Sequence, residues 1–246
     1  MASTVRFEHR YQGFQDGALG GYAAGVAARA IPGPAEVNLR ALPPMERDLE
    51  LREAGESGIE LWDGETLILE ARPAEFELEI PDPPSADEAA AASGRPIHEE
   101  GRHLYPGCFT CGPDRAEGDG LRLFMGRHPE DTPFLAAAWT PHERFGDDAG
   151  LLPPELVWAA LDCPTIWAAW ARSVPAAFPS GSFTVLARQR VAQPGRVPVG
   201  EAVTVTAWPI SEHGRKHVCG AAIHDRDGNL LARAESLLVE IPRETG

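Results

Sequence analysis

The chain has 246 residues, which is enough for two domains of about 120 residues each. Hydrophobic residues make up 43% of it, the share of a globular protein, so disorder throughout the chain is excluded. Acidic residues outnumber basic residues 37 to 22, and the formal net charge of −15 disfavours nucleic acids and anionic membranes as partners. The sequence shows neither a secretory signal nor a long apolar span, and its four cysteines suit a reducing compartment, so we expect a cytoplasmic protein without a membrane segment.

Residues 81–106 divide the chain, because this stretch is rich in Pro, Ala, Gly, Ser and acidic residues and has no clear strand or helix period. We interpret it as a linker. The sequence therefore predicts a first domain over residues 1–80 and a second over residues 107–246.

The first half begins with a predicted strand at Thr4–Tyr11, and an Ala-rich helix follows at Gly20–Ala30, where Pro32 and Gly33 end it. Asp63-Gly64 lies between two apolar runs and predicts a hairpin turn. Alternating patterns predict four strands after the helix: Glu36–Ala41, Arg47–Glu53, Gly58–Trp62 and Thr66–Arg72.

The second half repeats this order, with one predicted helix over residues 151–173 and a kink at its internal Pro164. The predicted strands are Leu121–Arg127 and Phe134–Thr140 before the helix, and Phe183–Val191, Ala202–Pro209, His217–Asp225 and Leu230–Ile241 after it. One helix and a run of antiparallel strands in each half indicate the α+β class, with each sheet wrapped around a single helix.

Several segments of the chain resemble the hotdog-fold thioesterase superfamily in its fused, double-hotdog form. The segments are GGYAAGVAARA (20–30), GLRLF (120–124), AAAWTP (136–141), PPELVWAALDCP (153–164) and the closing HDRDGNLLARAESLLVEI (224–241). The resemblance implies a tandem duplication in which two sheets become continuous and two central helices face each other. An acyl thioester such as acyl-CoA would enter between them, without a cofactor, and a homodimer of double-hotdog chains is compatible with this arrangement.

Asp162 is the first candidate catalytic residue, because a carboxylate among the apolar residues of a helix is costly unless it is paired or used. Its position matches the acidic residue of the family, and desolvation would raise its pKa towards that of a useful base. The alternative is a solvated or ion-paired helix residue.

Gly20 and Gly21 stand at the start of the first helix, where free N–H groups could bind a thioester carbonyl, although they could equally serve helix packing. A branch of the family places an amide at the position of Gln15, which could hold the carbonyl or the water or be an ordinary loop residue. Thr165 could bond the water or the Asp162 carboxylate, or simply the helix backbone.

The two halves differ at their equivalent positions. Counting eight residues back from Asp162 gives Pro154, and the same spacing from Gly21 gives Arg29. Proline donates no N–H, and Arg29 is no base. The sequence therefore predicts one composite site, which contains Gly21 and Asp162.

The remaining candidates concern metal and coenzyme A. Cys108 and Cys111 form a single CxxC with His103 and Asp114 nearby, and because no second CxxC exists we expect a tight turn and no metal. Arg188 and Arg190 could bind coenzyme A phosphates, with cross-strand ion pairing as the alternative.

The sequence thus predicts an acyl-thioester hydrolase, with Gly20, Trp158, Arg188 and Arg190 binding substrate. The alternative is a catalytically silent acyl-binding protein.

Overall fold

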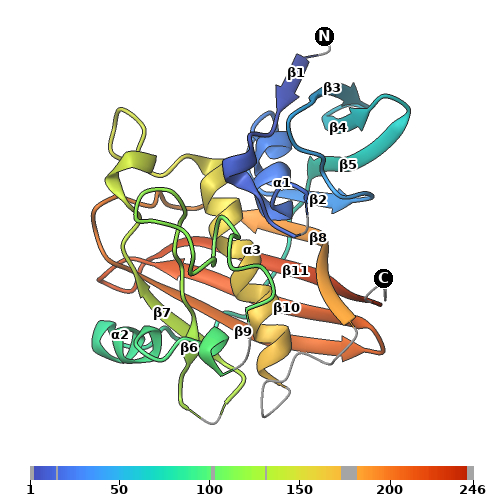
Figure 1. The fold of residues 1–246 in the computed structure, drawn as a ribbon. Coiled ribbons are helices and arrows are strands. Elements are labelled where there is room, and N and C mark those ends of the chain that lie inside the picture. The colour runs from blue at the N-terminus through green and yellow to red at the C-terminus, as the bar shows by residue number, and fades with distance from the viewer. Residues whose placement is uncertain (1–2, 15, 101–102, 131, 173–181, 243–246) are drawn as a thin grey trace.

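The computed structural model describes the chain except residues 1–2, 15, 101–102, 131, 173–181 and 243–246. Its described strands form one antiparallel sheet that curves behind two central helices (Figure 1). The strand order is β1-β3-β4-β5-β2-β8-β11-β10-β9-β7-β6. The bounds are β1 Ser3–Arg6, β2 Ala35–Leu39, β3 Asp48–Ala54, β4 Gly58–Asp63, β5 Thr66–Pro73, β6 Gly126–Arg127, β7 Leu135–Trp139, β8 Ser182–Ala192, β9 Val203–His213, β10 Lys216–His224 and β11 Leu230–Pro242.

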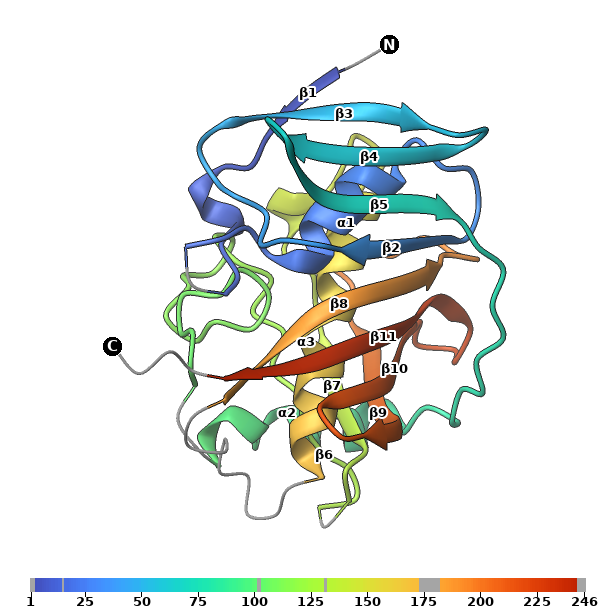
Figure 2. The same ribbon diagram turned by 90° about the vertical axis from the view of Figure 1, so that its right-hand side faces the viewer.

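The two halves meet where β2 of the first half pairs with β8 of the second, from Ala35 opposite Val191 to Asn38 opposite Arg188. Figure 2 shows the strands of both halves following one another across this junction without a break. The predicted α+β class and the two runs of antiparallel strands are confirmed.

Each half contributes one helix to the concave side of the sheet. Helix α1 (Gly20–Ala28) packs on β2, β4, β5 and β8, and helix α3 (Pro154–Ala171) packs on β7 to β11. The two helices also pack against each other. Pro154 is the first residue of α3, a position where a missing N–H costs no helical hydrogen bond, and Pro164 lies inside the same continuous helix. None of the helices that the structure describes has the length and apolar character needed to cross a bilayer.

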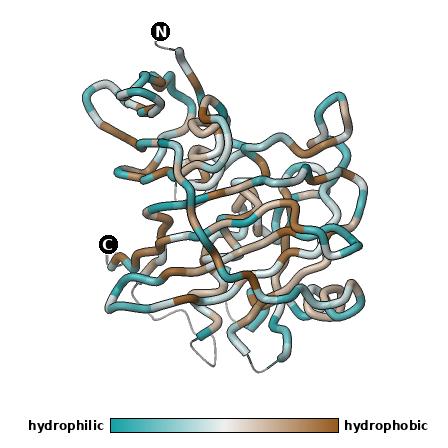
Figure 3. Tube along the Cα trace, turned by 180° about the vertical axis from the view of Figure 1, so that it is seen from behind, coloured by the Kyte–Doolittle hydropathy of each residue, from teal (hydrophilic) through white to brown (hydrophobic). Residues whose placement is uncertain are grey.

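The expected linker contains a helix that the sequence analysis did not predict. Helix α2 (Ala86–Ser93) begins with a capping box, in which Ser85 and Glu88 each bond the backbone N–H of the other, and it packs against β7. Before α2, the chain crosses the outer face of the sheet, where Arg233 of β11 donates to the Phe76 carbonyl at 3.0 Å (Figure 3).

The predicted strand at Leu121–Arg127 is wrong except for its last two residues, which form β6. Arg122 has a φ of 51°, a left-handed conformation that does not fit a strand. The backbone N–H groups of Leu121 and Leu123 instead donate to the carbonyls of Phe109 and Thr110, at 2.8 and 2.9 Å. This segment therefore supports the CxxC loop.

Candidate active site between the two helices

A pocket of about 440 Å³ lies between the start of α1, the middle of α3 and strand β8. Its volume is in the range of small-molecule sites, and its lining is largely apolar. From α3 it is lined by Asp162, Cys163, Ile166, Trp167 and Trp170. These positions recur on one side of a helix, so the sequence could have shown that Trp167 and Trp170 share a face with Asp162.

Asp162 is buried, with 1% of its surface exposed, and it contacts the start of the other helix. The backbone N–H of Gly21 donates to Asp162 Oδ2 at 2.7 Å. The second carboxylate oxygen, Oδ1, has no hydrogen-bond partner among the described residues. Asp162 therefore lines the pocket with one oxygen held by α1 and the other buried and unpartnered.

Burial raises the pKa of Asp162 to about 7, while the hydrogen bond from Gly21 acts in the opposite direction. The apolar surroundings solvate a carboxylate less well than water does, so the charged form of Asp162 is disfavoured. A carboxyl group whose pKa lies near neutrality is suited to general base catalysis.

The contact between α1 and α3 depends on glycine. A Cβ atom at Gly21 would lie 2.6 Å from Asp162 Cβ and 2.8 Å from the Trp158 carbonyl oxygen. One helical turn later, a Cβ at Gly25 would lie 2.6 Å from Glu155 Cα. The absence of side chains at these two positions lets the Gly21 N–H reach the carboxylate.

The other candidates from the sequence fall into different surroundings. Gly20 lines the pocket and, as the first residue of α1, has no acceptor within the helix for its own N–H. Thr165 donates its hydroxyl to the Asp162 backbone carbonyl at 2.7 Å, which is the helix-backbone alternative. Trp158 is buried against α1 and does not line the pocket. Gln15 lies outside the described residues.

Arg188 and Arg190 lie on β8, and neither lines the pocket. Both belong to a row of ion pairs across the sheet, the ionic row, whose carboxylates are Glu36 and Glu235. Arg190 donates to Glu36 at 2.6 Å and to Glu235 at 3.1 Å, and Arg188 donates to Glu235 at 3.1 Å. The structure thus shows the cross-strand pairing alternative for both guanidinium groups. The sequence could not reveal these partners, because they depend on the registers of β8 with β2 and β11.

The pseudo-equivalent position, where the C-terminal end of α1 meets the start of α3, holds an ion pair. Arg29, which follows α1, donates its Nε to Glu155 Oε2 at 2.9 Å and pairs with Oε1 through Nη2. Glu155 follows Pro154 in the first turn of α3. The two positions thus differ chemically: at one a carboxylate accepts from a backbone N–H, and at the other a carboxylate pairs with a guanidinium group.

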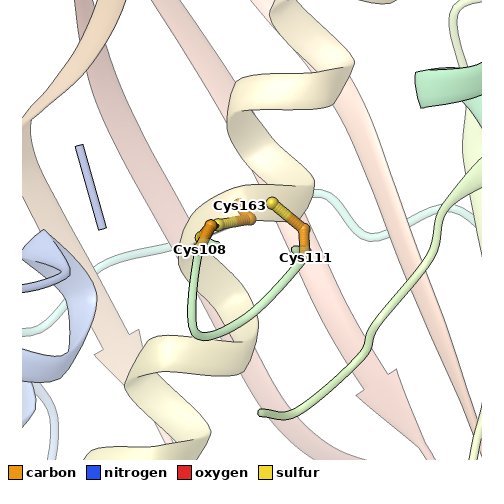
Figure 4. A group of neighbouring side chains, drawn as sticks. All are labelled: Cys108, Cys111 and Cys163. Atoms are coloured by element: carbon orange, nitrogen blue, oxygen red, sulfur yellow. The ribbon is translucent and has the colours of Figure 1, made fainter. Parts of the chain in front are cut away.

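A cluster of three cysteines lies next to Asp162. The sequence did not predict this cluster. Cys163 of α3 meets Cys108 and Cys111 of the CxxC loop, and the three Sγ atoms lie within 4.8 Å of one another (Figure 4). All three side chains are buried and line the same pocket. No local spacing could have shown this, because Cys163 lies far along the chain from the CxxC.

The sequence matches no known family model and no curated protein. Solved structures do share its fold. One is a tesB protein of Mycobacterium avium subspecies paratuberculosis, with 15% identity, a TM-score of 0.62, and coverage of 98% of this chain and 93% of that one. Another is the acyl-CoA thioesterase II TesB2 of Mycobacterium marinum, with 10% identity, a TM-score of 0.56, and coverage of 100% and 94%. The sheet and its two facing helices are therefore a shared architecture across nearly the whole of each chain.

Proposed function

From the double-hotdog fold that this chain shares with those structures, we propose that it hydrolyses acyl thioesters, with acyl-CoA as the substrate class. The observation that carries the proposal is the buried Asp162 carboxylate, bonded to Gly21 of the opposite helix at 2.7 Å in the wall of an apolar pocket. A buried carboxylate with one unpartnered oxygen costs stability, and such a cost is typical of a group that functions.

In the proposed reaction the acyl chain occupies the pocket and Asp162 accepts a proton from water. The resulting hydroxide attacks the thioester carbonyl carbon, and the C–S bond then breaks. The protonated Asp162 returns its proton to the leaving sulfur, so the products are a carboxylic acid and the thiol, and the carboxylate is restored. Asp162 lies in one position throughout because the Gly21 N–H holds its other oxygen. Orientation of this kind lowers the entropic part of the barrier.

The carbonyl oxygen gains negative charge in the transition state and needs a donor. Gly20 and Gly21 were both candidates for this role from the sequence, but in the structure the Gly21 N–H donates to Asp162. We assign the donor role to the N–H of Gly20, which precedes it, lines the pocket and lies at the positive end of the α1 dipole. Gln15, by its resemblance to the family amide, remains a second proposed partner of the carbonyl or the water.

The test is hydrolysis of a series of acyl-CoA substrates by the wild type and by Asp162→Asn. The variant keeps an oxygen that can accept from Gly21 but lacks the base, so we expect kcat/KM to fall by about 10²–10⁴-fold. Asp48→Asn makes the same chemical change at an exposed strand residue and should hydrolyse like the wild type. Near-normal turnover by Asp162→Asn would contradict the proposal.

The second candidate is a silent acyl-binding protein. It is favoured by one observation, namely that the Gly21 N–H already has Asp162 as its acceptor. Tight binding of acyl-CoA by the wild type without any turnover across the substrate series would support it.

A further inference from the structure

The CxxC loop and helix α3 bring three thiols to one point. Cys108 Sγ lies 3.6 Å from Cys163 Sγ, and Cys111 Sγ completes a group whose members are all within 4.8 Å of one another. Four ligands at the Zn–S distance of about 2.3 Å around a tetrahedral zinc ion place neighbouring sulfur atoms about 3.8 Å apart. The cluster therefore has the dimensions of a thiolate metal site.

The loop is built to hold this geometry. Gly112 follows Cys111, and its N–H donates to the Cys108 carbonyl at 2.9 Å. A Cβ at Gly112 would lie 2.4 Å from that same carbonyl oxygen, so the turn requires glycine. Thr110, between the cysteines, donates its hydroxyl to the Ala159 carbonyl of α3 at 3.0 Å. This bond attaches the loop to α3 one turn before Cys163, and Figure 4 shows the two loop cysteines beside Cys163.

We propose that Cys108, Cys111 and Cys163 bind a thiophilic divalent metal ion, with zinc as the ion that this site selects. The fold supplies the third thiolate that the single CxxC lacks in the sequence, so the expectation of no metal is replaced. Sulfur ligands in a compact arrangement favour zinc over oxygen-seeking cations such as magnesium or calcium. Burial in an apolar wall strengthens the attraction between the thiolates and the cation.

His103 lies close enough to the cluster to support it. Its Nδ1 accepts from the Tyr105 N–H at 3.1 Å, so in the neutral ring the proton is on Nε2. Nε2 is buried without a hydrogen-bond partner among the described residues, and the histidine lines the same pocket as the three cysteines. We therefore assign His103 to the surroundings of the metal ligands, where its ring interacts with Cys108. With three protein ligands, a water molecule would complete the coordination, since the cysteines line the pocket.

The position of this site gives it a role in organising the chain. Cys108 and Cys111 lie directly after the residues that connect the halves, and Cys163 is adjacent to Asp162. A metal ion here would fasten the entrance of the second half to the middle of α3. The proposal does not depend on hydrolysis, because it concerns the binding of a metal by three named thiols.

The test is metal analysis of the full chain, expressed with zinc in the medium and purified under reducing conditions without chelators. We expect one zinc ion per chain in the wild type. In Cys111→Ser and Cys163→Ser the zinc content should fall at least about tenfold. Cys219→Ser is the matched control, since Cys219 is equally buried but lies on β10 outside the cluster. It should keep the full zinc content.

Measurements on the wild type keep the proposal falsifiable if the variants fold poorly. Titration with an organomercurial should release zinc as three thiols react, and cobalt(II) added to the metal-free chain should give the visible absorption of a tetrahedral thiolate site. Removal of the zinc should lower the Tm of the wild type and of Cys219→Ser alike. Reduced wild-type protein that neither contains nor takes up zinc or cobalt(II) would overturn the proposal. So would a Cys108–Cys163 disulfide in the protein as purified, or zinc that remains in Cys111→Ser and Cys163→Ser.

Discussion

The hydroxyl of Thr165 is buried one turn from the proposed base, but its partner is the backbone of its own helix. It donates to the carbonyl oxygen of Asp162 at 2.7 Å. We expect Thr165→Val to lower the free energy of unfolding by about 1 kcal/mol, the contribution of one hydrogen bond, and to change kcat only a few-fold. Urea unfolding and acyl-CoA hydrolysis measure the two effects. A loss of kcat of about hundredfold, restored in Thr165→Ser, would instead place the hydroxyl in the reaction.

Single residues could be predicted from the sequence where their chemistry conflicts with their neighbours. Asp162 is such a case, since a carboxylate inside an apolar helix stands out without any structure. The resemblance predicted that Asp162 and Gly21 share one site, but not that the Gly21 N–H donates to the carboxylate itself. Arg188 and Arg190 conflict with nothing local, so whether they bind phosphate or carboxylate is decided by Glu36 and Glu235 on neighbouring strands. The cysteine cluster is hidden for the same reason.

Helices α1 and α3 pack closely because α1 has glycine where it contacts α3. Gly25 is a position where this close contact can be tested. A Cβ there would lie 2.6 Å from Glu155 Cα and 2.8 Å from Trp158 Cβ, both parts of the facing helix that have little freedom to move. We expect Gly25→Ala to destabilise the chain by about 1–3 kcal/mol, despite the better helix propensity of alanine.

The matched control is Gly94→Ala at the end of α2. Gly94 has a φ of −68°, and a Cβ there would lie 3.5 Å from the nearest carbonyl oxygens, an ordinary contact. It should change the unfolding free energy by less than about 0.5 kcal/mol. Equal effects of the two variants would show that the helix contact is not tight.

The helices and strands that could be predicted from the sequence are those with a regular hydrophobic pattern. Alternation and the Asp-Gly turns located most strands to within a few residues. The strand predicted at Thr4–Tyr11 is wrong in its second half, because β1 ends at Arg6 and His9–Tyr11 forms a 3-10 turn. Helix α2 was missed because its composition resembles a linker, although the Ser85-x-x-Glu88 capping box was a readable signal. The strand expected at Leu121–Arg127 failed because the left-handed backbone at Arg122 and the bonds to the CxxC loop prevail over apolar alternation.

The whole molecule has two pseudo-equivalent positions where α1 meets α3, and different groups occupy them. Since Arg29 and Glu155 pair with each other at one and Asp162 meets Gly21 at the other, we expect one acyl-CoA site per chain. Calorimetric titration with a non-hydrolysable acyl-CoA analogue measures this number. Arg29→Ala should leave the stoichiometry unchanged, because Arg29 lies at the other position. Two equal sites per chain would contradict the expectation.

The two halves are joined by a β2–β8 pairing, and a row of charges crosses this junction. Glu36 of β2 is buried, with 1% of its surface exposed, and it accepts from Arg190 of β8 at 2.6 Å and also from Arg72 of β5. Arg190 continues the row to Glu235 of β11 at 3.1 Å. Although burial alone would raise the pKa of Glu36, the hydrogen bonds from Arg190, Asn38 and Arg72 lower it to about 2.

This shift predicts how stability depends on pH. Because the folded pKa of Glu36 lies below its ordinary value of 4.5, the carboxylate contributes stability above that value. The contribution should disappear as the pH falls towards 2. At neutral pH we expect Glu36→Gln to lower the free energy of unfolding by about 2–3 kcal/mol, since it leaves the guanidinium groups of a largely buried row without one partner.

Urea unfolding of the wild type and of Glu36→Gln, at several values between pH 7 and pH 3, measures the difference. The control is Glu50→Gln, which breaks an exposed pair with Arg52 inside one strand and should change the free energy of unfolding much less than Glu36→Gln does. If Glu36→Gln were as mild as Glu50→Gln, or if its effect did not shrink towards low pH, the ionic row would not be what secures the junction. The backbone pairing of β2 with β8 would then hold the halves together, with the helices packed across it.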